Sequence, residues 1–352
     1  MTAHVRPARN AALALALFVA ALSCGAAFAA PSSEFSVTGG VTTPAVYDLA
    51  KLQARPTITQ TVGFLAGSTP QTHTYTGATL WGILDSAGIA SNPAVKNDVL
   101  NKYVLATGSD GYQAVFSLGE LNPNFGNRPD LVAYAETLGG ASAPLGADGL
   151  ASVTAPGDVR GGRYVANLVN LDVRGSGSTQ AASGGGASQQ FSVTGAVTNA
   201  MSFDLAALHA LTAIMTTVGA HTYTGVSFWD LLSSTVGIDL NPAVRNDVLG
   251  KYVVATGSDG YKSLFSLGEL SSLFGNQPDL IAYAVDGVSL GGDGFARIVV
   301  PNDVRMGRWV SNLVSLEVFS AAPVPEPGTW ALMLGGLIAV GAVAKRRGFS
   351  RA

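Results

Sequence analysis

Two pairs of arginines are the residues best suited to bind an anion. They are Arg160 and Arg163 in the first half of the chain and Arg305 and Arg308 in the second half. Each pair flanks a glycine-containing turn, and a guanidinium group can place two parallel hydrogen bonds on a phosphate or an acidic sugar. The alternatives are pairing with the nearby Asp158 and Asp303, or simple solvation.

Two histidines at matching positions, His73 and His221, do not make a metal site. Each lies two residues before a tyrosine. A metal site needs three or four converging ligands, and an isolated histidine without cysteine partners falls short of that number. We therefore expect ordinary histidines on strand surfaces and predict no metal site.

Matching serines and glutamates have the spacing of a helix cap rather than of a catalytic pair. Ser117 and Glu120 are three residues apart, as are Ser266 and Glu269. In a capping box the serine side chain and the glutamate side chain each accept a hydrogen bond from the other residue's backbone. The sequence has no Gly-x-Ser-x-Gly or His-Glu-x-x-His motif, so it names no catalytic residue.

Aromatic side chains offer a second possible binding feature. Tyr112 and Tyr261 follow Asp-Gly turns, where an exposed ring can stack on a sugar. Trp81 and Trp229 fall on predicted helices, where we expect them to pack in or at the edge of a core.

An internal repeat organises the chain that carries these residues. The segment "FSVTGGVTTPAVYDLAKL" from Phe35 returns as "FSVTGAVTNAMSFDLAAL" from Phe191, and further matches follow in the same order. We call residues 35–174 repeat 1 and residues 191–319 repeat 2. The uncharged Gly-, Ser-, Ala- and Gln-rich segment 175–190 between them predicts a flexible linker.

Each repeat reads as an α+β domain rich in antiparallel strands. Aspartates at 48 and 204 are placed to cap short helices, and Leu80, Ile83 and Leu84 have helical spacing. The Gly108–Gly111 segment predicts the turn of a hairpin. Alternating threonines from Thr57 predict another hairpin, longer in repeat 1 because residues 64–71 are extra.

The composition suits an exported protein without a nucleic-acid partner. Only 12% of the 352 residues are charged, and the net charge of −3 offers no basic face. Residues 1–29 have the order of a secretory signal peptide: basic residues, an apolar run and Ala27-Phe28-Ala29. We predict cleavage after Ala29, and lipidation at Cys24 is the less favoured alternative because Ala21 stands where lipoprotein signals carry leucine.

The C-terminal segment 324–352 has the three parts of a sorting signal. Proline and glutamate come first, an apolar run over 329–344 follows, and a basic cluster ends it; the residues are Pro325, Glu326, Pro327, Lys345, Arg346 and Arg347. Taken alone, this is a single membrane-spanning helix with a cytoplasmic end. It resembles the PEP-CTERM signal of Gram-negative bacteria. The resemblance implies processing by an exosortase, a cell-surface or matrix location and a link with extracellular polysaccharide.

Each repeat also resembles the sulfite-oxidase-like molybdopterin-binding oxidoreductase domain. The resemblance rests on "TGATLWGILDSAGI" and "TGVSFWDLLSSTVGI", on the Asp-Gly-Tyr hairpin followed by "FSLGEL", on "LVAY" or "LIAY", and on a final proline-containing strand pair. It implies a mixed α+β fold which, in active members, holds a molybdenum pterin cofactor through a cysteine thiolate.

The sequence departs from that family at the metal ligand. Its single cysteine is Cys24, in the predicted signal peptide, and Thr61 and Thr217 stand where we expect the ligand. A threonine hydroxyl stays protonated near neutral pH and cannot replace a thiolate on molybdenum. The twin-arginine pair that exports folded cofactor enzymes is also missing, since Pro7-Ala8 separates Arg6 from Arg9.

The sequence therefore favours a non-catalytic binding or structural module without a cofactor. The alternatives are a molybdopterin-dependent oxidoreductase with an unusual cysteine-free site, and a passive spacer in a surface assembly.

Overall fold

The computed structural model describes residues 31–321, which include both repeats and the segment between them. The predicted signal peptide with Cys24, the predicted span 329–344 and the sorting residues lie outside the described residues. Those sorting residues are Pro325, Glu326, Pro327, Lys345, Arg346 and Arg347. Within residues 31–321, none of the helices is long and apolar enough to cross a membrane.

Repeat 1 consists of two five-stranded sheets. The first has the order β2-β1-β10-β5-β6, from β1 (Phe35–Gly39), β2 (Ala45–Tyr47), β5 (Lys102–Gly108), β6 (Gln113–Ser117) and β10 (Leu168–Gly175). The second has the order β3-β4-β7-β8 with β9 beside β7, from β3 (Ile58–Ala66), β4 (Thr69–Thr79), β7 (Leu131–Leu138), β8 (Ala141–Pro144) and β9 (Ser152–Thr154). The first and last strands, β1 and β10, pair in parallel and so bring the two ends of the repeat together.

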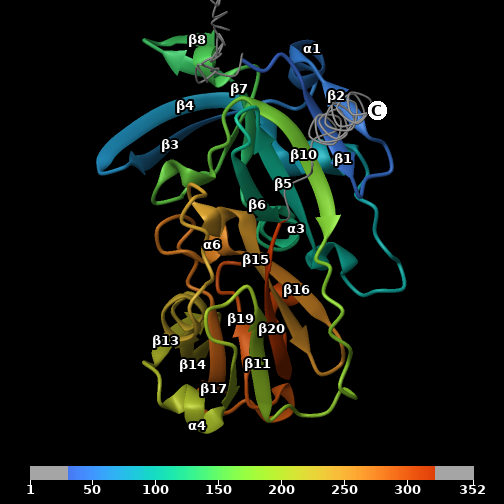
Figure 1. The fold of residues 1–352 in the computed structure, drawn as a ribbon, viewed down its shortest axis with the longest axis vertical. Helices are drawn as coiled ribbons and strands as arrows, with labels where there is room; N and C mark the ends of the chain where they lie inside the picture. The colour runs from blue at the N-terminus through green and yellow to red at the C-terminus, as the bar shows by residue number, and fades with distance from the viewer. Residues whose placement is uncertain (1–30, 322–352) are drawn as a thin grey trace, which may run out of the picture.

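Repeat 2 has the same two sheets in the same order (Figure 1). One contains β11 (Gln190–Gly195), β12 (Met201–Asp204), β15 (Lys251–Gly257), β16 (Lys262–Ser266) and β20 (Leu313–Ser320). The other contains β13 (Ile214–Val218), β14 (His221–Ser227), β17 (Leu280–Val285), β18 (Val288–Ser289) and β19 (Arg297–Val299). The described chain is thus strand-rich, with two similar pairs of sheets, as the repeat and the strand patterns predict.

The α-helices in the described part of the chain are few and short. They are α1 (Leu49–Gln53), α2 (Leu80–Ser86), α3 (Leu118–Leu121), α4 (Leu205–His209), α5 (Phe228–Asp230) and α6 (Leu267–Leu270). The predicted caps are confirmed, since Asp48 and Asp204 each accept from the backbone three residues on, at 2.8 Å. Helices this short have little stability of their own and depend on packing against the sheets.

The β3–β4 hairpin is longer than its counterpart β13–β14, which confirms the prediction from the extra residues. β3 and β4 have 9 and 11 residues, against 5 and 7 in β13 and β14. The extra residues include Phe64 on β3, whose ring centroid lies 4.5 Å from that of Tyr164.

The segment between the repeats is held in place, contrary to the flexible linker that its composition predicts. Ser176 N donates to Asn101 O in repeat 1, and Tyr252 Oη of repeat 2 donates to Ser176 O at 2.8 Å. Further on, Lys262 Nζ donates to Ser178 O at 2.9 Å. These contacts fix the linker at a few points on both repeats, while most of its residues remain exposed to solvent.

Both repeats have a core of their own, and a third cluster lies between them. That cluster joins residues from β5 and β6 to residues from β15 and β16, including Tyr103 and Tyr252, whose rings are 4.5 Å apart. In Figure 1 the repeats meet where α3, β6, α6 and β15 come together. The two repeats therefore form one body rather than two domains on a loose tether.

Candidate functional site

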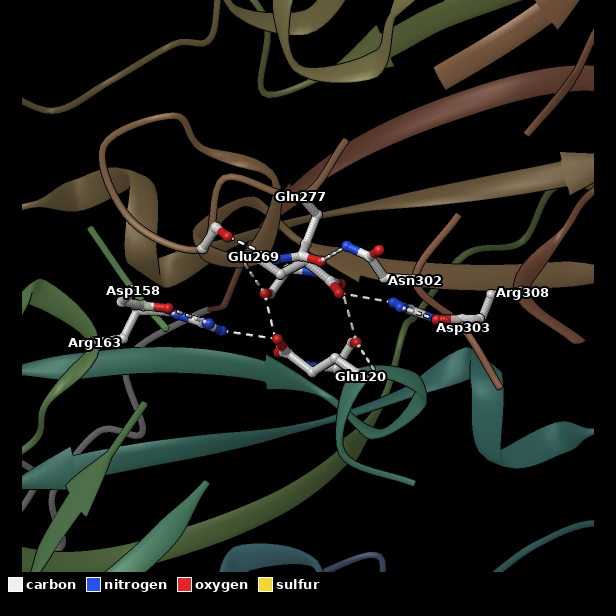
Figure 2. A network of polar contacts seen from close by, with 11 residues as sticks. Glu120, Asp158, Arg163, Glu269, Gln277, Asn302, Asp303 and Arg308 are labelled. Carbon is white, nitrogen blue, oxygen red and sulfur yellow. Dashed lines mark hydrogen bonds and ion pairs between the residues drawn. The ribbon is translucent and has the colours of Figure 1, made fainter. Parts of the chain in front are cut away.

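The most concentrated group of charged side chains lies buried between the repeats. Arg163 donates to Asp158 through Nε and Nη2, at 2.8 and 2.7 Å, and to Glu120 through Nη1 at 2.8 Å. Arg308 of repeat 2 binds Asp303 and Glu269 in the same way (Figure 2). These six side chains are at most 3% exposed. We call them the interface network.

Two helix caps position the glutamates of the interface network. The predicted capping boxes are confirmed: Glu120 N donates to Ser117 Oγ at 2.9 Å, and Ser117 N donates to Glu120 Oε1 at 2.8 Å. Ser266 and Glu269 repeat both bonds in α6. Each glutamate therefore keeps Oε2 for an arginine while Oε1 serves its cap.

The same caps also connect one repeat to the other. Ser117 Oγ donates to Glu269 Oε1 at 3.1 Å, and Ser266 Oγ donates to Glu120 Oε1 at 3.1 Å. The two bonds are related by the approximate two-fold relation between the repeats, as in an isologous dimer interface. Each glutamate thus binds a serine and an arginine of its own repeat and a serine of the other.

Glycines in the two capping helices, α3 and α6, allow the repeats to pack closely against each other. A Cβ at Gly119 would lie 2.6 Å from Arg308 Cδ, and one at Gly268 would lie 2.7 Å from Arg163 Cδ. Two backbone hydrogen bonds also join the repeats. Val159 N donates to Phe274 O and Val304 N donates to Phe125 O, both at 2.8 Å. Glycine is required in both capping helices because each supports an arginine stem from the opposite repeat.

Two further aspartates leave the buried region with more acid than base. Asp130 and Asp279 are 1% and 2% exposed, and neither carboxyl accepts or donates a hydrogen bond among the described residues. Each repeat thus buries three carboxyl groups with one guanidinium group. Burial raises the pKa of both aspartates well above the usual range, and it raises that of Glu269 to about 7. Burial thus favours the neutral form of these carboxyl groups.

The four predicted anion-binding arginines divide into two buried and two exposed. Arg163 and Arg308 are paired with Asp158 and Asp303, the alternative that the sequence left open. Arg160 and Arg305 are exposed. The short 3₁₀ turns that begin after Arg160 and Arg305 turn one arginine of each pair inward and leave the other outside, so the members of a pair do not converge on one ligand.

The two matching histidines, His73 and His221, lie on strands, and each is paired with one carboxylate. His73 Nδ1 lies 2.5 Å from Glu136 Oε1, and His221 Nδ1 lies 2.7 Å from Asp286 Oδ2. His73 also stacks between Phe64 and Tyr75, with ring centroids 5.5 and 5.6 Å away. Among residues 31–321, no three His, Cys, Asp or Glu side chains are grouped to hold a metal ion.

The tyrosines after the Asp-Gly turns also contribute to the interface between the repeats. Tyr112 Oη donates to Gly162 O at 2.5 Å and accepts from Asn246 of repeat 2 at 2.9 Å. Tyr261 makes the matching bonds to Gly307 and Asn97. Trp81 and Trp229 are partly buried and pack against the two cores, as expected. Both tyrosine hydroxyl groups are thus used for contacts between and within the repeats.

The residues present do not fit a molybdenum pterin cofactor at the expected ligand position. Thr61 is exposed on β3, and its Oγ1 lies 2.8 Å from Thr74 Oγ1 on β4. Thr217 is likewise exposed, 3.0 Å from Thr222 Oγ1. Both positions supply a neutral hydroxyl on a solvent-facing hairpin, whereas molybdenum favours soft sulfur ligands.

Asp130 and Asp279 are the buried residues that sequence reasoning missed. Each is preceded by a proline and followed by a strand, in "RPDLVAY" and "QPDLIAY", a context typical of an exposed turn. The only indication in the sequence was that each repeat has an aspartate at this position.

Comparison with known proteins gives a remote structural likeness. No protein-family model matches the chain, and no curated protein matches it in sequence. Among solved structures, the sulfane dehydrogenase SoxCD from Paracoccus pantotrophus is similar at a TM-score of 0.33 and 18% identity. The match spans 42% of this chain and 39% of that chain, and a likeness this remote assigns neither a family nor a function.

Proposed function

We propose that this chain is an exported surface or matrix protein whose two repeats act together as a non-catalytic binding or structural unit. The observation that carries this proposal is the interface network. The side chains best suited to acid–base or anion chemistry are bound to one another between the repeats. Residues that an enzyme would direct at a substrate here stabilise a pseudo-dimer.

In this proposal, the fold that resembles the sulfite-oxidase-like domain is a reused scaffold without the metal cofactor. A hydroxyl stands at both expected ligand positions, and each is satisfied by a neighbouring threonine. An oxidoreductase with a cysteine-free site would need another soft ligand. The described residues include no cysteine, because the single cysteine of the chain is Cys24.

Export and sorting rest on the two ends of the chain. The signal peptide over 1–29 would direct secretion, and the segment 324–352 would hold the protein in the inner membrane until an exosortase removes it. The processed protein would then reach the cell surface or the extracellular matrix. The proposed partner there is an extracellular polysaccharide.

Expression in a Gram-negative host with an exosortase tests this proposal. Replacing Pro325, Glu326 and Pro327 with alanine should keep the chain in the membrane at full mass, whereas the unchanged chain should lose its tail and leave the membrane. Purified unchanged chain should then sediment with the host's extracellular polysaccharide and not with dextran of similar size. Identical processing of both chains would contradict the sorting, and equal binding to both polymers would contradict a specific polysaccharide partner.

A further inference from the structure

One turn of repeat 2 is already bound by a peptide, namely the chain's own linker. The turn is Ser258–Gly260, which joins β15 to β16. Ser183 N and Gly185 N both donate to Ser258 O, at 2.8 and 3.0 Å, and Ser258 Oγ donates to Gly186 O at 2.6 Å. The linker thus wraps around one carbonyl and receives a hydrogen bond from the hydroxyl of the same residue.

Glycine is required for this wrapping at two linker positions. Gly184 and Gly185 have φ of +97° and +75°, which L side chains rarely adopt. Gly186 has no such requirement, because its φ is not positive and an added Cβ would meet nothing within 4 Å. The bound element is therefore a Ser-Gly-Gly turn with a tolerant position after it.

Repeat 1 has the same turn without the bound peptide. Ser109 N donates to Asn167 O at 2.9 Å, as Ser258 N donates to Asn312 O at 2.9 Å. Among the described residues, nothing binds the Ser109 carbonyl or hydroxyl, and a Cβ at Gly111 would meet nothing within 4 Å. Ser109 is half-buried, whereas Ser258 is only 3% exposed beneath the linker.

A larger cavity lies beside the open turn than beside the covered one. The cavity at Ser109 has a volume of about 570 Å³ and is bordered by Tyr112, Tyr164, Asn167 and, from repeat 2, Arg245. The matching cavity at Ser258 has about 250 Å³ and is lined in part by Gly185. The linker fills part of the space there, and Met306 lines the covered cavity where Gly161 lines the open one.

The sequence directly before repeat 1 differs from the linker at the two glycine positions. Ser32 N donates to Asn167 Oδ1 at 3.1 Å just as Ser188 N donates to Asn312 Oδ1 at 3.2 Å, which fixes the register between the two entering strands. In that register the positions of Gly184 and Gly185 correspond to Phe28 and Ala29. Neither residue is a glycine, so this stretch of sequence lacks the two glycines that the linker uses at Ser258.

We propose that the Ser109 turn and its cavity form a docking site for an uncharged, glycine-containing peptide loop of a partner protein. The loop would place two backbone N–H groups on Ser109 O and receive a hydrogen bond from Ser109 Oγ, as the linker does at Ser258. This site does not depend on the sorting or the polysaccharide binding proposed above. Three hydrogen bonds and a small contact give an expected Kd of roughly 1 mM for an isolated peptide.

A synthetic peptide of residues 178–189 is the probe, and the full-length chain in detergent micelles is the target. Saturation-transfer NMR suits weak binding and gives the Kd, with protein-free micelles as background. A photo-crosslinking version of the peptide, followed by mass spectrometry, locates the site. Two altered peptides are the matched pair: Gly186→Ala keeps the required conformation, and Gly184→Ala with Gly185→Ala removes it.

The expected results follow from the contacts that the linker makes with the Ser258 turn of repeat 2. The Gly186→Ala peptide should bind like the parent peptide, and the doubly substituted peptide should bind at least about tenfold more weakly, since each alanine in the left-handed region costs about 1–2 kcal/mol. Ser109→Ala in the protein should weaken binding about fivefold through loss of one hydrogen bond. Crosslinks should fall on residues 109–112.

Three results would overturn the proposal. They are no saturation transfer to the parent peptide, equal binding of the two altered peptides, and crosslinks confined to residues 258–261. The two peptide results use the unchanged protein, so they decide the question even if Ser109→Ala fails to fold.

Discussion

Replacing Arg308 with methionine should destabilise the whole described unit. The guanidinium group forms bonds to Asp303 and to Glu269 with its side chain only 3% exposed, so its loss leaves both carboxyl groups buried without a cation. Removing one partner of a buried ion pair costs about 3–5 kcal/mol. Methionine keeps most of the apolar stem that packs over Gly119, so the loss comes from the charge and its hydrogen bonds.

Urea unfolding of the full-length chain, followed by tryptophan fluorescence, measures this loss. We expect Arg308→Met to lower the free energy of unfolding by about 4 kcal/mol at neutral pH. Arg305→Met is the matched control, because Arg305 is exposed three residues earlier and should change stability by no more than about 0.5 kcal/mol. The loss of unfolding free energy in Arg308→Met should be smaller near pH 5, where the carboxyl groups of Asp303 and Glu269, left without the arginine, are more readily protonated.

An equal effect of the two substitutions would refute this reasoning. The same holds for a cost below about 1 kcal/mol for Arg308→Met, which falls short of any buried ion pair. Either result would mean that the interface network is not what joins the repeats.

Three further predictions concern the same interface and the linker. Burial raises the pKa of Glu269 to about 7 from its usual value of about 4.5, so its contribution to stability is complete below about pH 4.5 and is lost as the pH rises through about 7. The urea concentration at the unfolding midpoint should therefore fall between about pH 5 and pH 8. Glu269→Gln should flatten this trend, whereas Glu34→Gln, at an exposed position, should not. Equal slopes of the midpoint against pH in both variants would contradict the raised pKa of Glu269. Gly119→Ala should cost about 1–3 kcal/mol by overpacking against Arg308, whereas Gly250→Ala, with open space around it, should cost little. Equal melting temperatures of the two variants would mean that the Arg308 side chain can make room for a methyl group at no cost. Gly185→Ala should expose the amides of residues 183–185 to faster hydrogen exchange than Gly186→Ala does, and unchanged exchange would mean that the linker's positive φ is not needed.

Local features of the site were predictable because they depend on nearby residues. The three-residue spacing of Ser117 and Glu120 predicts a capping box, and both of its hydrogen bonds form. The Asp-Gly turn at Gly108–Gly111 and the longer first hairpin follow from local composition and length in the same way. These are contacts within a few residues, where sequence spacing largely determines geometry.

Contacts between the repeats could not be predicted from spacing. Nothing near Glu120 indicates that its Oε1 also accepts from Ser266, 146 residues away. Arg160 and Arg163 are both arginines beside glycines, yet only the fold decides which one turns inward. The linker shows the same limit, because its glycines suggest flexibility but serve as residues that can adopt positive φ around Ser258.

The molybdenum and pterin content of the chain tests the central claim most directly. The chain should be expressed without residues 1–29, in a host that makes molybdenum cofactor, so that the cofactor can load in the cytoplasm. A non-catalytic unit joined by the interface network predicts folded protein with neither molybdenum nor pterin fluorescence. Stoichiometric molybdenum with pterin would contradict the account and would place an unusual ligand near Thr61 or Thr217.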